Sequence, residues 1–206
     1  MWLCLPEWEG LTCYIVAGGP SVAAQDLTVL RGRKIIAVNS SYEKVPFAEY
    51  LFFGDSRWWF NHHPSLKDFK GKLITVSNAA LHPTVLNMRK INPPPGLTDI
   101  RTALVMRRTS LQGAINLAVH LGSSRIVILG ADMQVAADGR THHHKSHPWA
   151  LRAGCFDEQM DDLRLINKPA KRLGIEIINA STSSLIDWWP KKSLGECLDW
   201  PMSPSA

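Results

Sequence analysis

The chain has 206 residues, of which 45% are hydrophobic, and a formal net charge of +5. This length and apolar content are typical of one globular domain, and no run of about eighteen apolar residues would span a membrane. The first residues lack a basic segment ahead of an apolar one, so we expect no secretory signal and predict a cytoplasmic protein. The cysteines lack the spacing of a zinc knot or a disulfide framework, and we expect free thiols.

The first predicted strand and the turn after it are the most informative segment. Residues 14–17 form a short run of strand-forming apolar residues, typical of a buried parallel strand, and residues 18–21 follow with the sequence GGPS. Glycines permit a close backbone approach to a ligand, and we expect Ser21 to cap a helix that begins at Val22. Free N–H groups at such a helix start suit a phosphate. An ordinary strand-to-helix turn is the alternative, because GGPS matches neither GxGxxG nor the P-loop.

Apolar strand-like runs alternate with helix-like segments along the rest of the chain. The further predicted strands are residues 34–38, 50–53, 72–76, 125–129 and 176–178. This alternation predicts an α/β fold with a single open, mainly parallel, twisted sheet that has helices on both faces, of the Rossmann-like type. We assign residues 1–190 to one nucleotide-binding domain and expect residues 191–206 to form an irregular tail.

Two longer helices are predicted in the second half of the chain. Ser110 can cap the first, which runs up to the strand predicted at 125–129. The second is predicted over residues 156–173, where Pro169 should kink or split it. Asp161 and Asp162 lie within this helix rather than after a strand, so we expect them on its solvated face and not at a metal.

Polar residues follow directly after four of the predicted strands. In open α/β sheets the ligand lies off the carboxyl ends of the strands, so residues at these ends are candidates for one shared site. These residue types are also common in turns, and it is their recurrence at successive strand ends that favours a site. The residues predicted from strand ends to bind a nucleotide are Gly18, Gly19, Pro20, Ser21, Asn39, Asp55, Gly130 and Asp132.

Four histidines lie within residues 142–147, on a loop next to the predicted crevice. Such a loop can supply a general base near neutral pH, bind a leaving phosphate when protonated, ligate a metal, or be a flexible polar segment. No matched carboxylate or cysteine accompanies the histidines, so we predict no metal site. We favour His147 as the catalytic residue, since it lies nearest the following helix, with His144 second.

The basic residues occur in small groups rather than in one stripe, which suits phosphate-bearing ligands. No helix-turn-helix, zinc finger or aromatic RNA-binding signature occurs, so nucleic acid is a less favoured partner. The tryptophan pairs at 58–59 and 188–189 can stack on a base or sugar, but adjacent side chains do not face the same way. We therefore expect one tryptophan of each pair to pack in the core.

These segments resemble two known families, the family 42 sialyltransferases and the MptE-like domains, in which a strand leads to a G-x-GPS or similar turn. The resemblance extends from Thr12 to about Ile186 and includes VAGGPS, IAVNSSY, LFFGDS, the unit from TSLQG to LGADM, and LGIEIINAS. It implies that the GGPS turn and Asn39 contact a nucleotide. It also implies that Thr109 and Ser110, at a helix start, bind an anionic group of the donor and that the loop after Asp132 carries catalytic residues.

Two features depart from the sialyltransferase pattern. Those enzymes use a histidine shortly before the last helix, where residues 153–157 of this chain read AGCFD and the histidines lie earlier. Asp55 stands where the transferases tend to carry an amide. It is closer to the MptE-like pattern, whose type member is a pterin pyrophosphokinase that uses ATP and magnesium.

Three functions remain from these observations. The favoured one is a glycosyltransferase that resembles the metal-independent CMP-sugar (sialyl) transferases, with a loop histidine as base and an acceptor that the sequence does not identify. The second is an MptE-like pyrophosphokinase in which Asp55 and Asp132 hold magnesium and nucleotide phosphates. The third is a non-catalytic nucleotide-binding protein of a phage or bacterial modification system. Because the chain is short for a complete transferase, a homo-oligomer that completes the site is a further expectation.

Overall fold

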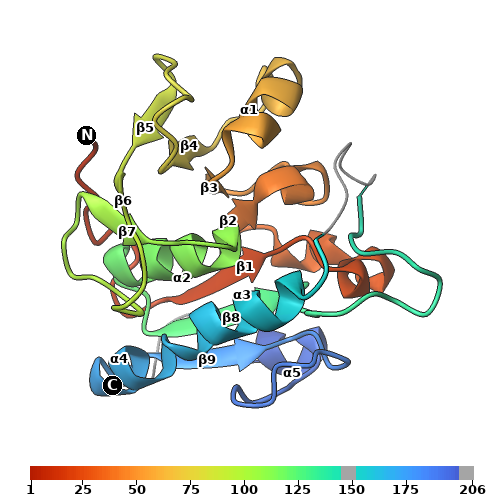
Figure 1. Cartoon of the computed structure of the whole chain (residues 1–206). Helices are drawn as coiled ribbons and strands as arrows, with labels where there is room; N and C mark the ends of the chain where they lie inside the picture. The colour runs from red at the N-terminus through yellow and green to blue at the C-terminus, as the bar shows by residue number, and fades with distance from the viewer. Residues whose placement is uncertain (145–151, 200–206) are drawn as a thin grey trace.

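The computed structural model describes residues 1–144 and 152–199 (Figure 1). Its strands are β1 (Thr12–Val16), β2 (Lys34–Val38), β3 (Tyr50–Phe53), β4 (Lys72–Thr75), β5 (Val85–Asn87), β6 (Arg89–Ile91), β7 (Ala103–Val105), β8 (Arg125–Leu129) and β9 (Glu176–Asn179). Its α-helices are α1 (Ser56–His62), α2 (Ser110–His120), α3 (Cys155–Arg164), α4 (Asn167–Arg172) and α5 (Leu194–Leu198). Its 3-10 helices are η1 (Pro20–Ala24), η2 (Leu27–Leu30), η3 (Asn39–Glu43) and η4 (His63–Leu66).

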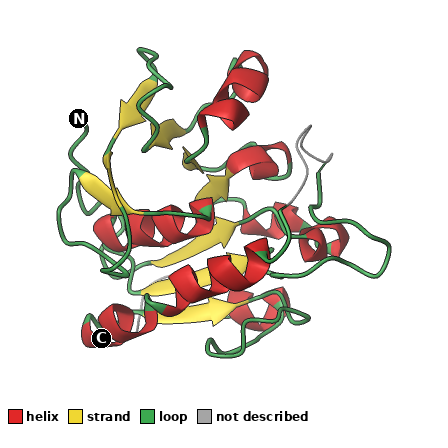
Figure 2. Ribbon diagram, viewed as in Figure 1, coloured by secondary structure: helices red, strands yellow, loops and turns green. Residues whose placement is uncertain are grey.

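A seven-stranded sheet in the order β5-β4-β3-β2-β1-β8-β9 forms the centre of the molecule (Figure 2). Every neighbouring pair in it is parallel, which confirms the predicted open α/β fold. The short strands β6 and β7 form a separate parallel pair. Strand β1 lies between β2 and β8, so the strand order reverses at β1 and a crevice is expected at the carboxyl ends there.

The core has two layers, one on each face of this sheet. Cys13 and Ile15 of β1 pack with α2, α3 and α4, and Figure 1 shows α2 and α3 lying across the near face. Tyr14 and Val16 pack on the opposite face with η1, η2, α1 and α5. Because both faces are covered, every residue of β1 is buried, and after Thr12 the strand is a continuous run of hydrophobic residues instead of alternating with polar ones.

Both tryptophans at 58 and 59 are buried, which corrects the expectation that only one of them packs in the core. Trp59 stacks on Phe53 of β3 with ring centroids 5.2 Å apart, while Trp58 donates its indole N–H to Ser40 Oγ at 2.9 Å. Because its indole N–H has this partner, Trp58 can be buried without leaving a polar group unpaired. At the other pair, Trp189 is buried and Trp188 is partly buried, as expected.

Two helix starts differ from the sequence prediction by one residue or more. After β1 the chain forms only the short helix η1, which has Gly19 at its N-cap, so Ser21 lies inside the helical turn and does not cap it. Proline at the first helical position is preorganised for this start because its φ is fixed. Helix α2 is capped by Thr109, whose Oγ1 accepts from Leu111 N at 3.2 Å, and not by Ser110.

The helix predicted over residues 156–173 is two helices, α3 and α4. Pro169 lies in the first turn of α4, where its missing N–H leaves no helical hydrogen bond unmade. The predicted irregular tail is corrected at α5, where Ser193 and Glu196 form a capping box and Cys197 is buried. No helix among residues 1–144 and 152–199 is long and apolar enough to cross a membrane. The four cysteines are free thiols, as predicted.

The substitution Gly130→Ala should destabilise the protein more than Gly32→Ala does. Both glycines have positive φ, at +75° and +81°, so each alanine carries a backbone cost of about 1 kcal/mol. A Cβ at Gly130 would also lie 2.6 Å from the carbonyl oxygen of Ala17, whereas nothing lies within 4 Å of a Cβ at Gly32. Urea denaturation should show an additional loss of about 1–3 kcal/mol for Gly130→Ala. Equal losses for the two variants would contradict the close approach.

Candidate functional site

A cavity of about 600 Å³ lies off the carboxyl ends of the strands, next to the point where the strand order reverses. Segments that follow β1, β2, β3 and β8 line it together with the start of α2 and part of α3. The sequence-predicted site residues that line it are Gly18, Gly19, Pro20, Asn39, Asp55, Thr109, Ser110, Gly130, Asp132 and His144. Ser21 is not among the lining residues, and His147 lies outside the described residues.

The turn after β1 and the segment after β8 approach each other closely. Gly19 N donates to Gly130 O at 2.9 Å, and a Cβ on Gly19 would lie only 2.0 Å from Asp132 Oδ2. No side chain fits at that position while Asp132 keeps its place. The glycine is therefore needed for backbone packing whether or not a ligand is bound.

Asp132 is 2% exposed, and its carboxylate is only partly satisfied by the protein. Oδ2 accepts from Ser21 N at 3.0 Å, which gives Ser21 a backbone role in place of the predicted cap. Oδ1 is shielded from solvent and has no hydrogen-bond partner among the described residues. Burying a carboxylate oxygen without a hydrogen-bond donor costs folding free energy, so a ligand donor that reaches Oδ1 would bind favourably.

Asn39 offers a second such acceptor. Its backbone has φ of +52°, in the left-handed region that asparagine tolerates better than most residues. Its Oδ1 is shielded and lacks a partner within residues 1–144 and 152–199. Both Asn39 and Asp132 line the cavity, so two residues of its wall carry an acceptor oxygen without a partner among the described residues.

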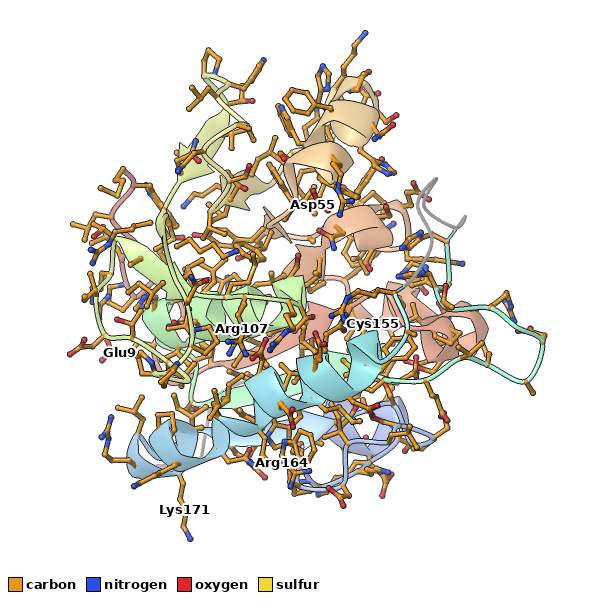
Figure 3. All side chains as sticks on the ribbon, in the orientation of Figure 1. Glu9, Asp55, Arg107, Cys155, Arg164 and Lys171 are labelled. Carbon is orange, nitrogen blue, oxygen red and sulfur yellow. The ribbon has the colours of Figure 1, made fainter. Side chains whose placement is uncertain are left out.

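Helix α2 begins at the cavity, and salt bridges join α3 to the two arginines that precede α2. Arg107 Nη2 lies 2.6 Å from Asp162 Oδ1, and Arg108 Nη1 lies 2.9 Å from the same oxygen. Arg108 Nε also pairs with Glu158 of α3 at 2.9 Å. Figure 3 shows Arg107 between α2 and α3. The Asp162 side chain is 1% exposed, so the expectation of a solvated face is wrong for this residue.

Asp162 is buried because α3 packs its polar face on the arginines ahead of α2. Gln112 of α2 adds to this contact by donating Nε2–H to the Asp162 carbonyl at 2.9 Å. Asp161, the neighbouring residue, is exposed. These contacts hold α3 against the start of α2, and Phe156 and Gln159 of α3 form part of the cavity wall. Sequence reasoning missed this wall, since a helical pattern alone does not say which polar residues meet a partner.

Asp55 lies at the start of α1, at one side of the cavity (Figure 3). Its Oδ1 accepts from Arg57 N at 2.8 Å, which caps the helix. Its Oδ2 also accepts from Arg57 Nη2 at 2.7 Å, so the carboxylate is paired with a guanidinium on its own helix. Sequence reasoning did not identify Arg57 as part of the site; an arginine two residues after a helix-capping aspartate was the available signal.

Residues 142–144 lie against the turn after β1. His142 and His144 line the cavity, and their ring centroids are 4.9 Å apart. His143 does not line it, and its ring Nε2 lies 3.0 Å from the hydroxyl of buried Ser41. Burial is the main cause that lowers the pKa of His143 to about 4, and the nearby side chains of His144, Lys44 and His142 add to it. His143 is therefore neutral at neutral pH.

A ligand could also be held by a metal-binding cluster or by another cavity. No group of three histidine, cysteine or acidic side chains in the described part of the chain is arranged to hold a metal ion. A second cavity of about 450 Å³ lies elsewhere, among the loop before β7, the end of α2 and α4. It includes Leu97, Arg101 and Val119 and shares no lining residue with the first cavity.

The fold resembles that of a known protein, although no match was found by sequence. No family model matches the chain. No curated protein matches it either. A solved structure of the sialyltransferase CstII from Campylobacter jejuni, in complex with the substrate analogue cytidine-5'-monophosphate, is similar with a TM-score of 0.52. The identity is 13%, and the match covers 90% of this chain and 86% of that one. The chain therefore has the open α/β fold of that sialyltransferase.

Replacing Asp162 with asparagine should destabilise the protein by about 1–3 kcal/mol, because it leaves two arginines without their shared carboxylate. Asp161→Asn is the matched control, since its side chain is exposed, and its effect should stay within about 0.5 kcal/mol. Urea denaturation of the two variants measures both values. Equal stabilities would show that the Asp162 carboxylate does not hold α3 to the start of α2.

Proposed function

We propose that the protein is a nucleotide-dependent transferase that binds a CMP-type sugar nucleotide in the cavity at the carboxyl ends of the strands. The observation that carries this proposal is the convergence of two unpartnered acceptor oxygens, on Asn39 and Asp132, with the N-terminal end of α2 in one cavity. The fold likeness to a sialyltransferase solved with CMP supports the choice of nucleotide.

The start of α2 is suited to the phosphate of such a donor. Thr109 and Ser110 line the cavity where the helix dipole presents its positive end, and α2 has 11 residues. Arg108 lies beside them, with its side chain 33% exposed and its guanidinium paired with Asp162 and Glu158. In a transferase these groups would stabilise the negative charge that develops on the departing nucleotide phosphate.

The acceptor oxygens are suited to the other parts of a nucleoside monophosphate. Cytosine carries an exocyclic amino group, and ribose carries two hydroxyls, all of which donate hydrogen bonds. Asn39 Oδ1 and Asp132 Oδ1 accept no hydrogen bond from the described residues, so such ligand groups can supply the missing donors. We assign them to the nucleoside, with Gly18, Gly19 and Pro20 giving the backbone approach that this ligand requires.

A loop histidine serves as the base in this proposal. His144 lines the cavity, next to His142, and can accept the proton of an acceptor hydroxyl as that oxygen attacks the donor sugar. His147, the candidate favoured from the sequence, lies outside the described residues. The acceptor is not assigned.

The carboxylate of Asp55 at the cavity is the observation that favours the second candidate, an ATP- and magnesium-dependent pyrophosphokinase of the MptE-like kind. Magnesium prefers oxygen ligands, and Asp132 supplies another carboxylate. Against it, both oxygens of Asp55 already accept hydrogen bonds from Arg57. A magnesium ion would have to displace this guanidinium, which makes the metal-independent transferase the better fit to the geometry.

Calorimetry with CMP, CDP, UDP, GDP and ATP, each with and without magnesium, tests the proposal. We expect CMP to bind and its affinity to be indifferent to magnesium. Asn39→Gly should weaken CMP binding by about 3- to 10-fold, the value of one net hydrogen bond, while glycine preserves the positive φ. Asn78→Gly, at an exposed loop residue outside the cavity, is the control and should bind like the wild type.

Each other outcome points to a different function. Magnesium-dependent ATP binding would support the pyrophosphokinase. CMP binding that survives without any transferase activity on a broad acceptor panel would support the third alternative, a non-catalytic nucleotide-binding protein. No binding by any of the nucleotides would contradict the proposed nucleotide site altogether.

A further inference from the structure

His143 is held by hydrogen bonds between two segments that border the cavity. Its backbone N–H donates to Gly18 O at 3.0 Å, in the turn after β1. Its ring Nε2 lies 3.0 Å from Ser41 Oγ, in helix η3. Ser41 is fully buried and its Oγ donates in turn to Ala17 O at 3.0 Å. His143 is thus hydrogen-bonded directly to Gly18 and, through Ser41, to Ala17, both far away in sequence.

The protons of this chain of hydrogen bonds can be counted. A serine hydroxyl has one proton, and Ser41 uses it toward the Ala17 carbonyl, which has none to offer. Ser41 Oγ must then accept from His143, so the proton of the neutral imidazole lies on Nε2. Nδ1 of His143 carries the lone pair; it is shielded from solvent and has no partner in the described parts of the chain.

The two neighbouring histidines, His142 and His144, lie close to Gly18. A Cβ on Gly18 would lie 3.2 Å from His142 Cδ2 and 3.6 Å from His144 Nε2, so both rings rest over this glycine. Both line the cavity, whereas His143 points to Ser41. The anchoring of the middle histidine therefore decides where the outer two are placed.

We propose that His143 is a positioning residue, which through its hydrogen bonds to Ser41 and Gly18 holds the side chains of His142 and His144 in the nucleotide cavity. The statement that the cavity takes a nucleotide rests on the proposed function. The anchor itself does not, because it consists of contacts within the protein. It follows that residues 142–144 should keep this arrangement before any ligand binds.

The substitutions His143→Gln and His143→Asn test whether the hydrogen bond from ring Nε2 to Ser41 matters, because both variants keep a polar side chain but only glutamine can reach Ser41. The amide nitrogen of glutamine can occupy the place of Nε2, while that of asparagine corresponds to Nδ1 and falls short of Ser41. We expect His143→Asn to speed hydrogen exchange at the amide of residue 143 by about tenfold relative to wild type, and His143→Gln to change it much less. His82→Asn, at an exposed histidine outside the cavity, is the control for loss of an imidazole.

Nitrogen-15 NMR of the wild-type protein reads the tautomer directly. The expected spectrum shows His143 neutral, with the proton on Nε2, in the absence of nucleotide. A proton on Nδ1 would overturn the anchor, as would equal exchange protection in the wild type and His143→Asn. These two readouts need no ligand.

CMP affinity then tests the positioning role. His143→Asn should weaken CMP binding by about 3- to 10-fold and His143→Gln should retain it. Unchanged affinity in His143→Asn, in a protein whose wild type binds CMP, would overturn the positioning role. If the wild type binds no nucleotide while the tautomer and exchange results hold, the proposed function fails and the anchoring of the loop stands.

Discussion

The site depends on the close approach of the turn after β1 to the segment after β8. Gly19 and Gly130 carry no side chain where one would collide with Asp132 or with Ala17. Because of this, Gly19 N reaches Gly130 O, and Ser21 N reaches one oxygen of Asp132. The other oxygen has no partner among the described residues, and Asp132 lines the cavity, so the same packing that joins the two central strands leaves an unpartnered acceptor on a residue of the cavity wall.

The walls of the cavity come from segments that are far apart in sequence and are joined by polar contacts. On one side, Asp162 holds α3 to the arginines ahead of α2. On the other, Ser41 and His143 tie the histidine loop to the first turn. Positive charge and helix N-terminus lie on the first side, and imidazoles lie on the second. In the proposed transferase, the donor phosphate at the start of α2 and the general base on His144 would thus be held by different segments of the chain.

Much of the sheet could be predicted because six of its strands, β1 to β4, β8 and β9, have four or five residues with an apolar centre and at least three buried positions. Strands β5, β6 and β7 have three residues each, too few for a periodic pattern, and were not predicted. The residues at strand ends could be predicted to meet, because parallel strands bring their carboxyl ends to one edge. The burial of Asp162, the pairing of Asp55 with Arg57 and the anchoring of His143 could not, since each depends on a side chain finding its partner in three dimensions.

The crevice between β1 and β8 is the proposed nucleotide site. Amide chemical-shift mapping of the nitrogen-15-labelled protein during a CMP titration tests this proposal. If CMP binds in the crevice, saturable shifts should concentrate at Gly18, Gly19 and Ser110, which line the cavity. Shifts confined to Leu97 and Val119, in the second cavity, or no saturable shifts at all, would contradict it.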